Sequence, residues 1–89
     1  MRVSIFGALR AVAGAKEVEV GAAGTVADVL EKLSVGYPAL AERLLDERGS
    51  LRGSILVLVN GRSIRFLHGV KTAIEESDRV ALFPPIGGG

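Results

Sequence analysis

The apolar run Ile55–Val59 constrains the fold more than any other segment of this chain. It reads Ile-Leu-Val-Leu-Val, and its length and β-branched side chains favour a strand over a helix. Asn60-Gly61 follows directly, and this dipeptide is a turn signal that ends the strand. Because odd and even positions are both apolar, whichever side turns away from the core presents a bare aliphatic surface.

The first twenty residues predict a β-hairpin. Residues 1–6 alternate, with Val3 and Ile5 on one side, and residues 16–20 alternate in the same way. Residues 7–14 contain two glycines and small side chains, which predict a turn region rather than a regular element. The two strands are therefore expected to pair through a long loop.

Two helical segments are expected between the hairpin and the apolar run. Thr25 and Asp28 form a T-x-x-D box, whose hydroxyl and carboxylate can cap a helix start, and Gly36 is expected to close this helix. Pro38 suits the first turn of a second helix, for which Gly49 is a natural stop. The apolar positions at helical spacing are Val26, Val29, Leu30 and Leu33 in the first segment and Leu40, Leu44 and Leu45 in the second.

The rest of the chain predicts a short return strand over 62–66, a polar connection over 72–78 and a last strand over 79–83. This order gives an α+β fold in which helices cover one face of the sheet. The other face must then meet water or a partner.

Strand parity places Phe6, Ala81 and Phe83 on that outer face if Val3, Ile5, Val80 and Leu82 point inward. An exposed apolar patch of this kind usually marks a binding surface, and core packing is the alternative for both aromatic rings. Arg10 follows the first strand and has two readings, a contact to an acidic group of a partner or a solvated side chain.

Composition excludes several functions. The chain has 89 residues, a net charge of +1 with basic and acidic residues interspersed, and four aromatic residues, so nucleic-acid binding is not expected. It has no cysteine, which excludes disulfides, thiolate zinc sites and a cysteine nucleophile. No apolar run reaches the roughly 18 residues of a membrane span, and the first residues lack a signal-peptide pattern. We therefore expect a cytoplasmic protein without membrane contact.

The last seven residues, Phe83-Pro84-Pro85-Ile86-Gly87-Gly88-Gly89, form an uncharged segment directly after the last strand. The prolines end strand pairing, so the segment is expected to project from the body of the protein. Glycine lacks a Cβ, so a narrow enzyme cleft could admit the terminal carboxylate of Gly89. A frayed terminus is the alternative reading, and the preceding Phe-Pro-Pro counts against it.

These features together resemble the MoaD/ThiS family of ubiquitin-like sulfur carriers, and in particular the small subunit of molybdopterin synthase. The resemblance rests on the Phe-Pro-Pro tail with its terminal Gly-Gly, on Val59-Asn60-Gly61, on Asp78 before the last strand, and on Leu9-Arg10. This chain departs from the family at Glu76-Ser77-Asp78, where Asp-Gly-Asp is common, and at Gly87, where a bulkier residue is common. The resemblance implies a ubiquitin-like β-grasp domain over residues 1–84, with a mixed sheet of four to five strands, and a flexible tail over 85–89.

The resemblance also implies a function. An ATP-using activating enzyme would adenylate the carboxylate of Gly89, and a sulfur donor would convert it to a thiocarboxylate. Pro84, Pro85, Ile86, Gly87 and Gly88 would thread into the larger catalytic subunit of molybdopterin synthase, where the sulfur passes to a pterin precursor of the molybdenum or tungsten cofactor. Such a chain is no enzyme on its own and binds no metal or cofactor itself. Phe83, Phe6, Ala81 and Arg10 would contact the partner.

Two alternatives share the same activation chemistry: a modifier that forms isopeptide bonds to lysines, and a sulfur carrier for thiamine or tRNA thiolation. Surface lysines such as Lys16, Lys32 and Lys71 do not separate them. His68 is the only histidine, and Glu75, Glu76 and Asp78 cluster in a predicted turn, so neither predicts a catalytic or metal site.

Overall fold

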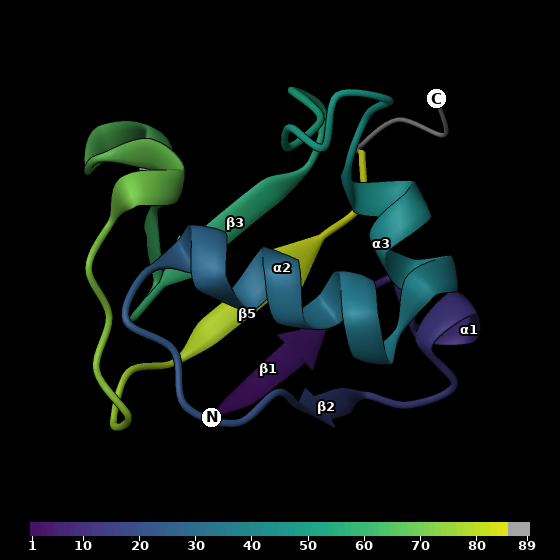
Figure 1. Cartoon of the computed structure of the whole chain (residues 1–89), viewed down its shortest axis with the longest axis horizontal. Coiled ribbons are helices and arrows are strands. Elements are labelled where there is room, and N and C mark those ends of the chain that lie inside the picture. Colours follow the sequence, from purple (N-terminus) through teal and green to yellow (C-terminus); the bar gives the residue numbers. More distant parts are fainter. Residues whose placement is uncertain (86–89) are drawn as a thin grey trace.

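The computed structural model describes residues 1–85 and shows a five-stranded mixed sheet with helices packed on one face (Figure 1). The strand order is β2-β1-β5-β3-β4. The strands are β1 (Arg2–Ile5), β2 (Glu17–Glu19), β3 (Leu56–Val59), β4 (Arg62–Ser63) and β5 (Val80–Phe83). The helices are α1 (Leu9–Ala13), α2 (Val26–Gly36) and α3 (Pro38–Leu44), with 3-10 turns η1 (Ile64–Phe66) and η2 (Gly69–Lys71).

The predicted hairpin is confirmed, because β1 and β2 pair antiparallel with Val3 opposite Val18. The two ends of the described chain also meet in the sheet, since β5 lies parallel to β1 and antiparallel to β3. The centre of the sheet is therefore built from β1, β5 and β3, three of the most apolar segments of the sequence.

Helix α2 begins where the capping box predicted. The Thr25 hydroxyl accepts a hydrogen bond from the Asp28 N–H at 3.2 Å, and the Asp28 carboxylate accepts one from the Thr25 N–H at 3.1 Å. These two bonds satisfy donors that the first turn of a helix leaves free. Figure 1 shows α2 lying across one face of the sheet, with α3 and α1 beside it.

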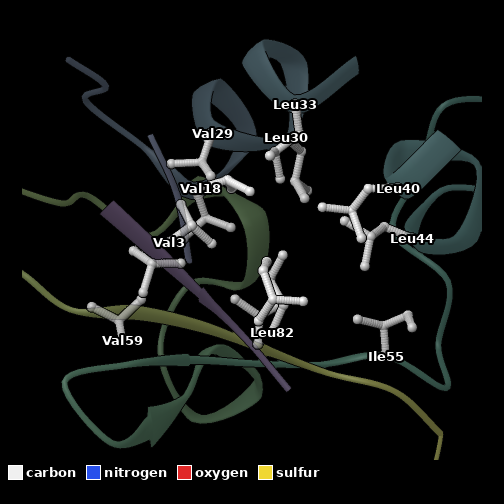
Figure 2. Packing of buried hydrophobic residues seen from close by; sticks show 14 of the residues in the cluster. Val3, Val18, Val29, Leu30, Leu33, Leu40, Leu44, Ile55, Val59 and Leu82 are labelled. Atoms are coloured by element: carbon white, nitrogen blue, oxygen red, sulfur yellow. The ribbon is translucent and has the colours of Figure 1, made fainter. Parts of the chain in front are cut away.

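The core lies between this helical layer and the sheet. Ile5, Leu33, Leu40, Leu44 and Leu82 have no exposed surface. Figure 2 shows core side chains from the helices and the strands pointing toward one another; the labelled residues are Val3, Val18, Val29, Leu30, Leu33, Leu40, Leu44, Ile55, Val59 and Leu82. The periodic positions predicted for α2 are all buried, as are Leu40 and Leu44 of α3.

Three local predictions are wrong. The turn region expected over 7–14 contains helix α1, because its alanines favour a helix and Leu9 anchors it in the core, with Gly14 capping it at φ 76°. Helix α3 ends at Leu44 instead of continuing toward Gly49, since Leu45 is extended and forms a β-bridge with Leu51. The return strand is only β4, because buried Ile64 draws the chain into the turn η1.

Candidate functional site: the outer sheet face and the root of the tail

The sheet face opposite the helices carries a band of apolar side chains, which we call the outer face: Phe6, Leu56, Leu58, Ala81 and Phe83. On β5, Val80 and Leu82 are buried whereas Ala81 and Phe83 are partly exposed, so the predicted parity is confirmed. The register places Leu56 opposite Phe83 and Leu58 opposite Ala81 on β3. Leu56 and Leu58 of the apolar run are partly exposed, whereas Val57 and Val59 are buried. The run therefore supplies the bare aliphatic surface that the sequence predicted.

The two aromatic residues of the outer face form a stack. The ring centroids of Phe6 and Phe83 lie 4.3 Å apart, and the ring planes differ by 6°. The parallel pairing of β1 with β5 produces this contact, because Ile5 lies opposite Leu82 and the next residue on each strand is a phenylalanine. Both rings are partly exposed, so they belong to the outer face and not to the buried core.

Arg10 joins this aromatic pair from helix α1. Its guanidinium carbon lies 5.1 Å from the centroid of the Phe6 ring, a cation–π arrangement, and its Nε–H donates to the carbonyl of Ile5 at 2.7 Å. The residue is exposed, and these contacts hold its charge over the Phe6 ring of the aromatic pair. The structure thus brings Phe6, Phe83, Ala81 and Arg10, the predicted partner-binding residues, to one surface.

The root of the tail is fixed by a contact between Pro84 and Gly7 that the sequence did not reveal. Gly7 has a φ of 58°, in the left-handed region, and a Cβ built at this position would lie 2.7 Å from Cγ of Pro84. The Phe6 N–H donates to the Leu82 carbonyl at 3.1 Å, which extends the pairing up to this point. Glycine at position 7 is therefore what allows the proline ring to pack against the end of β1.

Pro84 is partly buried and Pro85 is exposed, which agrees with strand pairing ending at the prolines. Both line a groove of about 410 Å³, whose walls also include Leu9, Arg43 and Arg52. The remaining predicted site residues, Ile86, Gly87, Gly88 and Gly89, lie outside the described residues.

The acidic turn before β5 has a structural role. The Asp78 carboxylate accepts hydrogen bonds from the Asn60 side-chain amide at 2.9 Å and from the Glu75 N–H at 2.7 Å, and these bonds lower the pKa of Asp78. The Asn60 side chain in turn accepts from the Arg79 N–H at 2.9 Å, which ties the turn after β3 to the start of β5. His68 is exposed at the start of η2.

The chain's amino terminus forms a second charged cluster. The Met1 ammonium donates to Glu19 at 2.5 Å and to the Gly21 carbonyl at 3.1 Å, and Glu76 lies at 3.2 Å. The hydrogen bond to Glu19 raises the pKa of the amine, and the same bond lowers the pKa of Glu19. Among residues 1–85 there is no group of three or more histidine, cysteine or carboxylate residues able to hold a metal ion, and no helix long and apolar enough to cross a membrane.

The mixed sheet, the covering helix and the apolar outer face define the ubiquitin-like β-grasp class of small carrier and modifier proteins. Within that class the chain belongs to the ThiS family, whose model matches residues 3–89. The predicted family and fold are thereby confirmed.

Several known relatives are similar over nearly their whole length. The chain is 37% identical to small archaeal modifier protein 3 of Haloferax volcanii, covering 100% of this chain and 98% of that protein. It is 33% identical to the sulfur carrier protein CysO of Mycobacterium tuberculosis, covering 98% and 96%. The crystal structure of SAMP1 from Haloferax volcanii superposes with a TM-score of 0.86 at 37% identity, covering 100% and 98%. The family therefore includes both sulfur carriers and protein modifiers.

Proposed function

We propose that this chain is a sulfur carrier that bears its sulfur as a thiocarboxylate on Gly89, and that it serves as the small subunit of a molybdopterin synthase. The observation that carries the proposal is the continuity between the apolar outer face and the root of the tail. Phe83 belongs to the face, and Pro84, the next residue, begins the segment that leads to Gly89. A partner that docks on this face therefore lies beside the start of the tail.

The chemistry proceeds in two steps at the carboxylate. An activating enzyme joins the Gly89 carboxylate to AMP, using ATP and releasing pyrophosphate, because a free carboxylate is a poor electrophile. A hydrosulfide ion then attacks the carbonyl carbon, a C–S bond forms, and AMP leaves with the C–O bond electrons, so that Gly89 ends as a thiocarboxylate. The sulfur is held by the main chain, so a carrier without cysteine can perform this role.

The larger catalytic subunit would accept the loaded tail. Pro85 to Gly89 spans about 16 Å when extended, at roughly 3.3 Å per residue, which is long enough to enter a partner's active site. There the sulfur would attack a carbon of a pterin precursor and displace an oxygen substituent, which leaves as water, and a second water molecule would cleave the acyl–sulfur bond and restore the carboxylate. The Phe-Pro-Pro tail and the Val59-Asn60-Gly61 turn support a pterin precursor as the sulfur acceptor, because they resemble the small subunit of molybdopterin synthase.

A second candidate function is protein modification, and the similarity to small archaeal modifier protein 3 favours it. In this case the activated Gly89 carbonyl is attacked by a lysine amine, and an isopeptide bond forms in place of the thiocarboxylate. Both functions require activation of Gly89, so the fate of the activated group separates them.

The test is intact-mass spectrometry after incubation with the cognate activating enzyme, ATP and sulfide. We expect a gain of about 16 Da from exchange of oxygen for sulfur. A chain lacking Gly89, or one extended by a single residue beyond it, should show no gain and an unchanged far-UV circular dichroism spectrum. Normal loading of either variant would refute the proposal. Adding the larger subunit and a pterin precursor should discharge the sulfur, whereas high-mass conjugates that map to lysines would favour the modifier.

A further inference from the structure

A groove of about 770 Å³ runs along the edge of the sheet, remote in sequence from the tail and its root. Its walls come from the end of β2 with the segment after it and from α2 with the residue that follows this helix. Its apolar residues include Val20, Ala23, Val35 and Tyr37. Val35 is 83% exposed although it is large and apolar, and it is one of two such residues in the part of the chain described here. Figure 1 shows α2 running above β2 at this edge.

The backbone of β2 leaves its outer hydrogen-bonding groups free of the sheet. β2 is the last strand in the sheet order, so its only strand partner among residues 1–85 is β1. The even residues bond to β1, as shown by the Val20 N–H donating to Met1 at 3.0 Å and Lys16 accepting from Ile5 at 2.8 Å. In an antiparallel pair the bonding residues alternate, so the N–H and C=O of Glu17 and Glu19 point away from β1.

The charges around this edge select the occupant. Glu19, Asp28 and Glu31 line the groove together with Lys32, and Glu17 adds a further carboxylate on the strand. The Met1 ammonium already binds Glu19, so the two cations leave an excess of negative charge on the other carboxylates. A second copy of the chain fits poorly, because antiparallel pairing centred on Val18 would place Glu17 of one copy directly opposite Glu19 of the other. Like charges in directly opposed positions destabilise a strand pair.

We propose that the β2 edge and the adjoining groove bind an extended, apolar peptide segment that carries lysine or arginine residues. The segment adds as a sixth strand beside β2 and bonds to the free groups of Glu17 and Glu19. Alternate side chains of an added strand point to the same side, so its apolar residues enter the groove against Val35 and Tyr37. Its basic residues alternate with the apolar ones, so they lie on the opposite side of the added strand, near Glu17. This site is separate from the outer face and does not depend on the proposed function.

The experiment uses the whole chain, isotopically labelled, titrated with the peptide acetyl-Lys-Val-Ile-Val-Lys-amide and followed by the NMR shifts of its backbone amides. We expect the largest shifts at Glu17, Glu19, Val35 and Tyr37. A peptide with glutamate in place of both lysines should bind at least about tenfold more weakly, because it meets the same carboxylates. Shifts centred on Phe6 and Phe83, or equal binding of the two peptides, would overturn the proposal.

Four variants separate the backbone contact from the groove. Glu17→Pro removes one outward N–H together with the Glu17 carboxylate, and an edge strand tolerates proline where the N–H is not used in the sheet. Glu17→Gln keeps the N–H and removes only the charge, so the difference between these two variants measures the backbone contact. Val35→Asp places a charge in the groove, and Phe66→Asp is its matched control, since Phe66 is 87% exposed and lies outside the groove lining. We expect Glu17→Pro and Val35→Asp to weaken binding at least about tenfold and Phe66→Asp to change it less than about twofold. Equal weakening by Val35→Asp and Phe66→Asp would contradict a specific site, as would unchanged binding by a folded Glu17→Pro variant.

Discussion

The contact between Gly7 and Pro84 makes Gly7→Ala an informative substitution. Gly7 has a φ of 58°, and an added Cβ would lie 2.7 Å from Cγ and 3.1 Å from Cδ of Pro84. Two costs therefore combine at this position: the strain of an L-residue in the left-handed region, and a steric overlap with a proline ring. Gly14 offers a matched control, because its φ is 76° and an added Cβ would have nothing within 4 Å.

The magnitudes of the two costs can be separated. An L-residue in the left-handed region costs about 1–2 kcal/mol, and this applies to both glycines. Overpacking costs about 1–3 kcal/mol and applies only to Gly7. We therefore expect Gly14→Ala to lower the free energy of unfolding by about 1–2 kcal/mol and Gly7→Ala to lower it by about 2–5 kcal/mol.

Urea unfolding followed by circular dichroism measures both values. Replacing Pro84 by glycine in the Gly7→Ala background should recover most of the difference between the two single variants, because the overlapping ring is gone. If instead Pro84 moves to relieve the overlap, the tail root shifts and sulfur loading at Gly89 should fall while stability resembles that of Gly14→Ala. Equal stability of the two single variants together with unchanged loading would refute the role assigned to this contact.

Three further predictions follow from burial and charge. Leu82→Ala, at a fully buried position, should cost about 2–5 kcal/mol of unfolding free energy, whereas Phe83→Asp should cost less and weaken partner binding in a pulldown; an equal loss of stability would place Phe83 in the core. The Met1 amine has a pKa raised above 8.0, so its bond to Glu19 stabilises the fold below about pH 8 and loses effect as pH rises through the raised pKa. Acetylating that amine should remove this alkaline dependence from urea midpoints, and its persistence would contradict the pairing. The hydrogen bonds that lower the pKa of Asp78 stabilise the fold at pH values above 3.8, the ordinary pKa of this carboxyl, and the stabilisation is lost as the carboxylate is protonated in acid. Asp78→Asn should therefore lower the free energy of unfolding at neutral pH, and the difference from the unsubstituted chain should vanish at low pH.

The sequence predicted those features that depend on local pattern. The capping box at Thr25, the hairpin and the parity of the last strand each follow from residues a few positions apart. Helix α1 was missed because glycine at both ends of the segment suggested a turn, although Leu9 followed by alanines was a signal for a short helix. The early end of α3 depends on the bridge from Leu45 to Leu51, which pattern alone does not specify.

The contacts that the sequence did not predict are non-local. The Phe6–Phe83 stack needs the parallel register of β1 with β5, and the Gly7–Pro84 contact needs the same register one residue further on. The groove beside β2 depends on that strand lying at the edge of the sheet, which the order of elements along the chain leaves open. Parity identified the residues of the outer face, whereas their geometry required the assembled sheet.

The outer face can supply the free energy that the proposed tail insertion needs. Ordering the five residues Pro85–Gly89 costs on the order of 5 kcal/mol or more. At about 25 cal/mol per Å² of apolar surface, burial of roughly 200 Å², or roughly 100 Å² on each partner, offsets this ordering cost. The separate cost of association, about 4–15 kcal/mol, must come from the rest of the interface. Phe6, Phe83 and the aliphatic residues beside them are partly exposed, so an area of this size is within their reach. Because Pro84 packs on Gly7 at the border of this face, a partner that docks there lies beside the residue at which the tail begins.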